Sequence, residues 1–206
     1  FDIKPNNLAP GEPLHLTILG GSLGASIFAE LLPLAISTLT HDIRSRLRLT
    51  QQCRVEQLDA LRSAYQELGV TATVESFFDD IPDIMATSHL VICRAGASSV
   101  AELAAAGRAA ILVPLPSAMD DHQTANAQQM ASVGGGLCRA EAELDASILA
   151  KDITNLFGDE KKLAQMSQNA RKLAMPNAAR TIADYALALA DRNGQQLAQS
   201  FSGGRS

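Results

Sequence analysis

HLVICRAGASSVAELAAAG, residues 89–107, changes character halfway along its length. Its first part, HLVICR (89–94), is an apolar run of strand length, and its second part is an alanine-rich run typical of a helix that Gly107 closes. The polar or small residues at the junction are Arg94, Gly96, Ser98 and Ser99. The stretch therefore predicts a buried strand that passes through a polar turn directly into a helix.

The same order of strand and helix recurs along the chain. Strands are predicted at 14–21, 46–52, 71–77, 89–94 and 109–116, with a short one at 136–139. Helices are predicted at 25–39 (with a kink at Pro33), 55–69, 81–88, 99–107, 121–132 and 145–193, the last with a break at Met175–Pro176. The strands are apolar throughout rather than alternating. This pattern predicts an α/β fold, a Rossmann-like parallel sheet with helices on both faces.

Length and composition fit one large globular domain or two very small ones. The chain has 206 residues, of which 47% are hydrophobic and 19% charged, enough for a single sizeable core. We expect the domain to span 14–193, after a linker remnant at 1–13 and before a disordered tail at 194–206. The polar lead-in, which starts without Met, also suggests a piece of something larger.

Charge and cysteine content exclude several classes of protein. The formal net charge of −5 argues against a nucleic-acid binder, and the short basic run RSRLR (44–48) is better explained as a strand with one wet face. Three separated cysteines without a CxxC pair form neither a disulfide framework nor a zinc site. We find no signal peptide and no apolar run of the roughly 20 residues that a membrane-spanning helix needs.

Four unusual loops follow predicted strands. They are GGSLGA (20–25), FFDD (77–80), RAGASS (94–99) and PLPSAMDDHQTANA (114–127). In parallel sheets, ligands bind outside the carboxyl ends of the strands. The sequence therefore predicts that these loops meet at one edge and form a ligand site there.

GGSLGA allows three interpretations. Gly21, Ser22 and Gly24 could bring backbone N–H groups close to an anion at a helix start. The segment also fits G-x-S-x-G, the nucleophile elbow of hydrolases, with Asp120 and His122 available as partners for Ser22. The third interpretation is a tight turn that only needs small residues.

The junction at 94–102 also has two interpretations. Ser99 and Glu102 have the spacing of a capping box, in which the two residues satisfy the first N–H groups of a helix. That explanation leaves Arg94 and Gly96 unused, whereas a helix N-terminus beside an arginine is suited to a phosphate. Glu102 could then hold vicinal hydroxyls, as acidic residues do for ribose in nucleotide-binding folds.

DDHQTANA (120–127) places amide side chains on one helix face. Gln123 and Asn126 are three residues apart, and neutral amides suit sugar hydroxyls, although a polar helix start facing solvent explains them equally well. Metal binding by residues 120–122 is a poor explanation, and the chain has no D-x-D motif. In FFDD, Phe77 and Phe78 are either core residues or the wall of a pocket for a base.

Taken in order, GGSLGA, FFDD, CRAGASSVAELAAAG and DDHQTANA resemble the carboxyl-terminal half of the MurG family, in glycosyltransferase family 28. The resemblance covers about residues 14–190. It implies one half of a GT-B glycosyltransferase, an inverting enzyme that moves GlcNAc from UDP-GlcNAc to lipid-linked muramoyl-pentapeptide in peptidoglycan synthesis. An amino-terminal domain would bind the lipid-linked acceptor. The enzyme would act as a peripheral protein at the cytoplasmic face of the bacterial plasma membrane.

The resemblance also implies roles for residues of this chain. Ser22 would contact the phosphates, the Phe78 backbone the uracil, Glu102 the ribose hydroxyls and Gln123 the GlcNAc hydroxyls, with His122 and Asn126 near the sugar. The full set expected to bind UDP-GlcNAc is Gly21, Ser22, Gly24, Phe78, Arg94, Gly96, Ala97, Ser98, Ser99, Val100, Ala101, Glu102, His122, Gln123 and Asn126. It implies no cofactor, no metal and no nucleic acid, and it puts the catalytic base in the other domain.

Some features depart from that family, and they leave alternatives open. The family's amino-terminal glycine-rich loop and an interdomain arginine are not in this sequence, and Cys53 stands where the family usually has glycine. We therefore interpret the chain as a donor-binding half that is inactive alone. The alternatives are the donor subunit of another or a split GT-B transferase, or a non-catalytic UDP-sugar-binding module.

Overall fold

The computed structural model describes residues 8, 11–21, 26–116, 121–178 and 180–189. By its internal contacts the chain divides into two units, residues 1–174 and residues 175–206. We describe each unit by itself.

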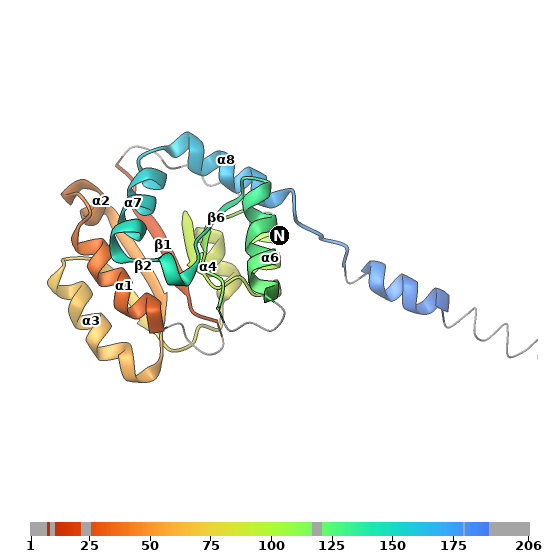
Figure 1. Cartoon of the computed structure of the whole chain (residues 1–206), viewed down its shortest axis with the longest axis horizontal. Coiled ribbons are helices and arrows are strands. Elements are labelled where there is room, and N and C mark those ends of the chain that lie inside the picture. The colour runs from red at the N-terminus through yellow and green to blue at the C-terminus, as the bar shows by residue number, and fades with distance from the viewer. Residues whose placement is uncertain (1–7, 9–10, 22–25, 117–120, 179, 190–206) are drawn as a thin grey trace, which may run out of the picture. The chain divides into compact units, whose positions relative to one another are not determined.

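The described part of the first unit contains a six-stranded parallel sheet with the order β3-β2-β1-β4-β5-β6 (Figure 1). The strands are β1 (Leu14–Leu19), β2 (Leu47–Gln52), β3 (Thr71–Glu75), β4 (Leu90–Cys93), β5 (Ala109–Leu112) and β6 (Gly136–Cys138). From β1 the chain first builds outward through β2 to β3, then crosses to the other side of β1 for β4. The predicted Rossmann-like parallel sheet is confirmed.

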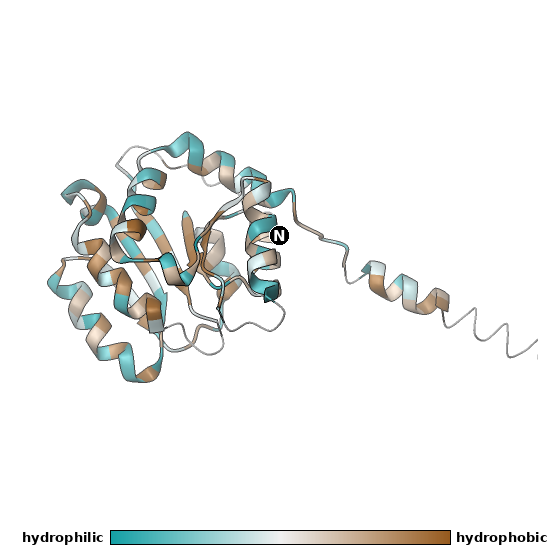
Figure 2. Ribbon diagram, in the orientation of Figure 1, coloured by the Kyte–Doolittle hydropathy of each residue, from teal (hydrophilic) through white to brown (hydrophobic). Residues whose placement is uncertain are grey.

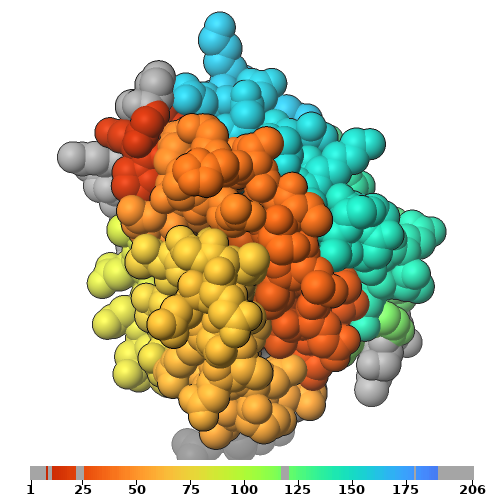
Figure 3. Space-filling view, turned by 90° about the vertical axis from the view of Figure 1, so that its left-hand side faces the viewer, coloured from red at the N-terminus to blue at the C-terminus, as the bar shows by residue number. Residues whose placement is uncertain are grey.

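Helices cover both faces of this sheet. They are α1 (Ser26–Ser37), α2 (His41–Arg46), α3 (Leu58–Glu67), α4 (Ile81–Thr87), α5 (Ala97–Ala106), α6 (His122–Ser132), α7 (Ala146–Phe157) and α8 (Glu160–Arg171). Among the elements described in full, short 3-10 turns follow β2 and β6: η1 (Val55–Gln57) and η3 (Glu141–Glu143). Figure 3 shows the face on which α3, α1 and α7 lie side by side, in agreement with the packing of α1 against both neighbours.

Side-chain alternation in the central strands divides the core into two clusters. In β1, Leu14, Leu16 and Ile18 are fully buried and pack in the cluster under α1, α3 and α7. In β4, Val91 and Cys93 point to the other cluster, under α4, α5 and α6. Burial on both faces explains the continuous apolar runs of β4 and β5, whereas β1 and β2 also carry polar residues, so that the sheet shows both brown strands and banded ones in Figure 2. The outer strand β3 is largely exposed.

The structure corrects the sequence prediction in two places. RSRLR (44–48) does not form one strand, because α2 continues to Arg46 and β2 begins only at Leu47. The long predicted helix from residue 145 is also interrupted at Gly158 and Asp159, where the Asp159 carboxylate accepts a hydrogen bond from Lys162 N at 2.9 Å and begins α8. Asp159 thus supplies a new N-cap.

The second unit contains a helical segment, described at residue 178 and over 180–189. Its large apolar side chains are exposed: Ile182, Tyr185, Leu187 and Leu189. In neither unit is any described helix both long enough and apolar enough to cross a membrane.

A pair of histidines joins β1 and β4 near their amino ends. His15 N donates to His89 Nδ1 at 2.9 Å, His89 N donates to His15 O at 2.9 Å, and the ring centroids are 5.3 Å apart. Because Nδ1 accepts this bond, His89 is neutral in the folded chain. Burial, helped by His15 and Arg108, lowers the pKa of His89 from 6.5 to about 4, against a smaller opposing effect of Glu12.

This lowered pKa predicts a loss of stability in mild acid. Between pH 6.5 and about 4 the unfolded chain binds more protons at His89 than the folded chain, so stability falls as the pH drops through that window. Because solvent partly screens the half-buried ring, we expect the protonation of His89 to lower the free energy of unfolding by about 1–2 kcal/mol across this window. The measurement is urea unfolding of wild type and His89→Asn at pH 7.5 and pH 4.5. Asparagine keeps an acceptor near the position of Nδ1 but does not titrate. Between pH 7.5 and pH 4.5 the free energy of unfolding should therefore fall less for His89→Asn than for wild type. Equal losses in the two proteins would contradict this assignment.

Candidate functional site

The carboxyl ends of the parallel strands bring the predicted loops to one edge. β1 pairs with β4 up to Leu19 and Cys93, and β4 pairs with β5 up to Leu112. β1 and β4 are also where the strand order reverses, the position at which open α/β sheets bind ligands. Of the glycine-rich loop the structure describes Gly21, with φ of 73°, whereas Ser22 and Gly24 lie outside the described residues. The predicted roles of these three residues stay predictions.

The N-terminus of α5 stands in the middle of this edge. The helix begins at Ala97, with Gly96 as an N-cap in extended conformation that gives no side-chain hydrogen bond. Ala97 and Ser98 are exposed, so the first N–H groups of α5 are accessible at this edge of the sheet. The helix dipole gives this end of α5 a positive potential. This arrangement is suited to an anion such as a phosphate.

The capping box predicted at Ser99 and Glu102 is wrong. Because α5 begins two residues before Ser99, that serine lies inside the first turn and is not the N-cap. Glu102 is exposed, and within the described part of the chain its carboxylate has no hydrogen bond or ion pair. Partial desolvation raises the pKa of this carboxyl. Glu102 is therefore available to a ligand instead of being used by the helix.

Val100 and Ala101 complete the first turns of α5 with different exposures. Val100 is buried in the core cluster under α5, and Ala101 is exposed beside Glu102. The nearby thiol of Cys93 is fully buried, and burial together with Glu102 raises its pKa to about 12. This thiol is therefore protonated at neutral pH and has little nucleophilic character.

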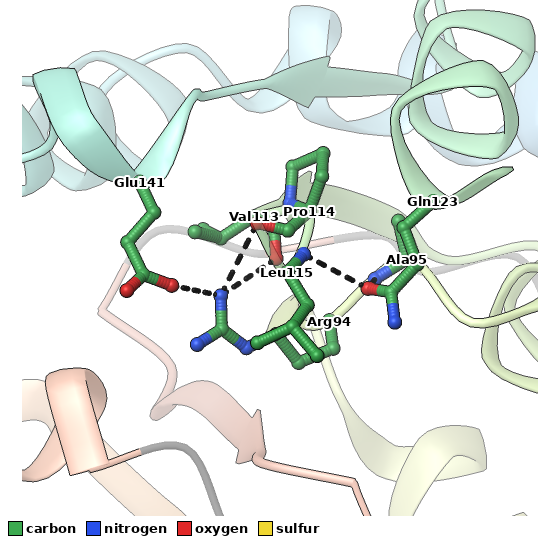
Figure 4. A network of polar contacts seen from close by, with 7 residues as sticks. All are labelled: Arg94, Ala95, Val113, Pro114, Leu115, Gln123 and Glu141. Carbon is green, nitrogen blue, oxygen red and sulfur yellow. Dashed lines mark hydrogen bonds and ion pairs between the residues drawn. The ribbon is translucent and has the colours of Figure 1, made fainter. Parts of the chain in front are cut away.

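Arg94, predicted to lie near a phosphate, has its guanidinium engaged by other parts of the chain. Its Nη1 donates to the carbonyls of Val113 at 3.2 Å and Pro114 at 3.3 Å and forms an ion pair with Glu141 of η3 (Figure 4). The guanidinium also lies over the Phe28 ring, 5.5 Å from its centroid. No contact in the structure tests the predicted phosphate role.

Gln123 joins the loops after β4 and β5. Its Oε1 accepts hydrogen bonds from Ala95 N at 3.2 Å and from Leu115 N at 3.0 Å (Figure 4). Two N–H donors at one atom fix the amide orientation, since a flip would place N–H groups against N–H groups. Among the described residues Nε2 has no partner, so the side chain offers only donors to a ligand.

The neighbouring residues of α6 lie at the same edge. Asn126 Nδ2 donates to Ala95 O at 3.0 Å. Gln123 and Asn126 together therefore bind both the N–H and the carbonyl of Ala95. His122 is exposed at the first position of α6. Before it, Asp121 has φ of 52°, a conformation in which aspartate is several-fold enriched. Asp120, the predicted partner of the hydrolase alternative, lies outside the described residues.

The FFDD loop lies at the far end of the edge, after β3. Phe77 is 68% exposed, which rules out a core role for it, and Phe78 is half-buried. Four strand spacings separate β3 from β5, a distance of about 19 Å at roughly 4.8 Å per strand. The residues that follow β3 and those that follow β5 therefore start far apart along this edge.

Several residues of this site were not identified from the sequence. They are Ala95, the Val113–Leu115 segment and Glu141, which act through backbone groups or from a distant part of the chain. The Gln123–Asn126 spacing was a usable signal, because both contact Ala95. Among the described residues no group of three His, Cys, Asp or Glu side chains could hold a metal ion.

Comparisons with known proteins identify the family. The glycosyltransferase family 28 C-terminal domain matches residues 15–182. A Rhodospirillum rubrum protein named UDP-N-acetylglucosamine--N-acetylmuramyl-(pentapeptide) pyrophosphoryl-undecaprenol N-acetylglucosamine transferase is 48% identical over 182 residues, 88% of this chain and 47% of that protein. A Rhodospirillum centenum protein of the same name is 47% identical over 88% of this chain and 48% of its own length.

Solved structures agree with this result. The crystal structure of Acinetobacter baumannii MurG has a TM-score of 0.78 and 36% identity, over 86% of this chain and 50% of that one. The lipopolysaccharide glycosyltransferase WaaG, at 19% identity over 80% of this chain and 43% of its own, has a TM-score of 0.61 and supports the fold alone. The chain spans about half the length of the curated relatives it matches. It belongs to glycosyltransferase family 28, and the matched region is the C-terminal domain of that family.

Proposed function

We propose that the chain is the donor-binding half of a transferase that moves GlcNAc from UDP-GlcNAc to a lipid-linked muramoyl-pentapeptide. The observation that carries this proposal is the 48% identity to a transferase of that name over 88% of the chain. The position of the α5 N-terminus between the segments after β3 and β5 supports it, because a nucleotide sugar is an elongated ligand with a diphosphate in its middle.

We propose one orientation of UDP-GlcNAc at this edge. The uracil lies at the Phe78 backbone, and the diphosphate lies at the free N–H groups of α5 and at the glycine-rich loop. Glu102, which has no partner among the described residues, accepts hydrogen bonds from the ribose hydroxyls. Gln123 reaches the sugar through Nε2, with His122 and Asn126 nearby.

In this proposal the chemistry needs a second domain. The acceptor hydroxyl oxygen forms a bond to the anomeric carbon as the bond from that carbon to the diphosphate oxygen breaks, with inversion, and a base in an amino-terminal domain takes the hydroxyl proton. The transition state has oxocarbenium character, as in glycoside hydrolysis. This chain positions the donor and stabilises the leaving diphosphate through the α5 dipole and N–H groups.

The acceptor defines the setting of the reaction. A lipid-linked acceptor lies at a membrane surface, and the donor nucleotide is a cytoplasmic metabolite. We therefore place the whole protein in the cytoplasm, as a peripheral protein at the inner face of the bacterial plasma membrane. The amino-terminal domain would make the lipid contact.

The first test is calorimetric titration of the chain with UDP-GlcNAc, UDP-glucose and UDP, for wild type and Glu102→Ala. A hydrogen bond to a charged group contributes about 1.5–3 kcal/mol, so losing it should weaken binding of all three ligands about 10- to 150-fold. Glu160→Ala is a matched control, since it removes an exposed carboxylate from α8, outside the predicted site. Equal affinities for wild type and Glu102→Ala would contradict the ribose role. No binding by the folded wild-type chain would contradict the proposed function of the chain by itself.

Two substitutions at Gln123 separate its contacts with the fold from its contact with the sugar. In Gln123→Glu a carboxylate oxygen still accepts from Ala95 N and Leu115 N, but the second oxygen replaces the Nε2 donor. We expect thermal stability near wild type, unchanged binding of UDP, and about 10-fold or more weaker binding of UDP-GlcNAc. In Gln123→Leu both backbone bonds are lost, and stability should fall by about 1–3 kcal/mol. If Gln123→Glu bound UDP-GlcNAc as wild type does, the donor assignment would be wrong.

The division of labour predicts binding without turnover. The 206-residue chain should bind UDP-GlcNAc and should transfer no radiolabelled GlcNAc to a lipid-linked acceptor. The control is the same assay after the amino-terminal half of a relative has been added. Transfer by the chain alone would refute the assignment of acceptor binding and base to another domain.

A further inference from the structure

Two consecutive residues reach the same segment of chain by different routes. The Arg94 side chain donates to the carbonyls of Val113 and Pro114, while Ala95 N is joined to Leu115 N through Gln123 Oε1. The contacts form a closed ring from Arg94 across 113–115 to Gln123 and back through Ala95. Figure 4 shows Glu141 on one side of the 113–115 segment and Gln123 on the other.

Glu141 holds the guanidinium in this ring. The Arg94 side chain is 13% exposed and that of Glu141 is 26% exposed, so the charges of both are poorly hydrated. A poorly hydrated guanidinium needs a charge partner and hydrogen-bond acceptors, which Glu141 and the two carbonyls supply. The guanidinium also lies over the Phe28 ring of α1, and this cation–π contact favours its position. The orientation of Arg94 is thus set by the protein itself.

We propose that Arg94 and Glu141 are a positioning pair for Gln123, and that Arg94 is not a phosphate ligand. The inference rests on the proposed function, because it concerns how the sugar end of that site is built. By fixing the carbonyls of Val113 and Pro114, the guanidinium fixes the peptide planes that lead into Leu115. The direction of Leu115 N–H then sets where Gln123 presents Nε2.

The two roles of Arg94 predict opposite effects of removing Glu141. If Arg94 bound the diphosphate, loss of the competing carboxylate would free the guanidinium, and binding would strengthen or stay the same. If the pair positions Gln123, loss of either partner misplaces the 113–115 segment, and binding of the sugar nucleotide weakens in both cases. The sign of the Glu141 effect therefore decides between the two roles.

The experiment is calorimetric titration of Arg94→Met, Glu141→Leu and the double variant with UDP-GlcNAc and UDP. Each single variant should weaken binding of UDP-GlcNAc about 5- to 30-fold, the effect of misdirecting one ordinary hydrogen bond, and binding of UDP by less than about 3-fold. In the double variant no buried charge is left without its partner, so the melting temperature should rise above those of the single variants. Binding of UDP-GlcNAc should stay weakened, because the carbonyls of Val113 and Pro114 remain unheld.

A second ion pair provides the matched control. Arg139, just after β6, binds the buried Asp152 of α7 through two hydrogen bonds of 2.7 and 2.8 Å. Arg139→Met should lower the melting temperature without changing the ratio of the affinities for UDP-GlcNAc and UDP. If the Arg94 and Glu141 variants also left that ratio unchanged, or if binding recovered together with stability in the double variant, the pair would be merely structural.

A measurement without ligand separates this inference from the proposed function. Glu141 contacts neither Ala95 N nor Leu115 N in the described contacts, yet Glu141→Gln should shift the amide resonances of both in a ¹H–¹⁵N correlation spectrum. Unshifted resonances would overturn the positioning role whether or not the chain binds a nucleotide. Shifted resonances in a chain that binds no UDP compound would uphold the coupling of Glu141 to Gln123 and reject the proposed function.

Discussion

The arrangement of the site depends on the parallel pairing of β1 with strands on both sides. β2 and β4 pair with β1 on its two sides, so the chain first adds β2 and β3 on one side of β1 and then crosses over to add β4 on the other side. Parallel pairing puts every strand-to-helix turn at the same edge, and the burial of Leu14, Leu16 and Ile18 fixes β1 in the core. The segments that follow β1, β4 and β5 therefore start at the same edge of the sheet.

The fold was largely predictable from the sequence, for a physical reason. The central strands β4 and β5, buried on both faces, are apolar throughout, and α5 between them carries its own stop signal, Gly107, which has φ of 59°. Short elements with mixed composition were not predictable in the same way. The six residues of α2 contain two arginines that equally suit a strand with one wet face.

The candidate site was predictable in its location but not in its internal contacts. Loop composition indicated Glu102 and Gln123 as candidate binding residues, because unusual polar residues stood at strand ends. It could not identify Glu141 as the partner of Arg94, since the two are far apart in the sequence and an isolated glutamate carries no signal. The capping-box error at Ser99 has a related cause. The pattern S-x-x-E also occurs within the first turns of a helix whose N-cap is an earlier residue, here Gly96.

Gln123 serves the fold and the proposed site with different atoms of one amide. Its oxygen satisfies two backbone donors, and its nitrogen is left for a ligand. A buried donor without an acceptor destabilises a protein, so the fold itself requires an acceptor at this position. Stability alone therefore keeps the residue in the orientation that the proposed site uses, before any ligand arrives.

The contacts proposed to orient Gln123 join residues from Arg94 to Glu141, which belong to one continuous stretch of chain, and among the described residues the Phe28 ring contacts Arg94 from outside that stretch. Such a stretch can be inherited as a block. Recombination between relatives that exchanged β4 through η3 intact would transfer the sugar-facing arrangement as a whole, whereas a crossover between Pro114 and Glu141 would separate the two charges.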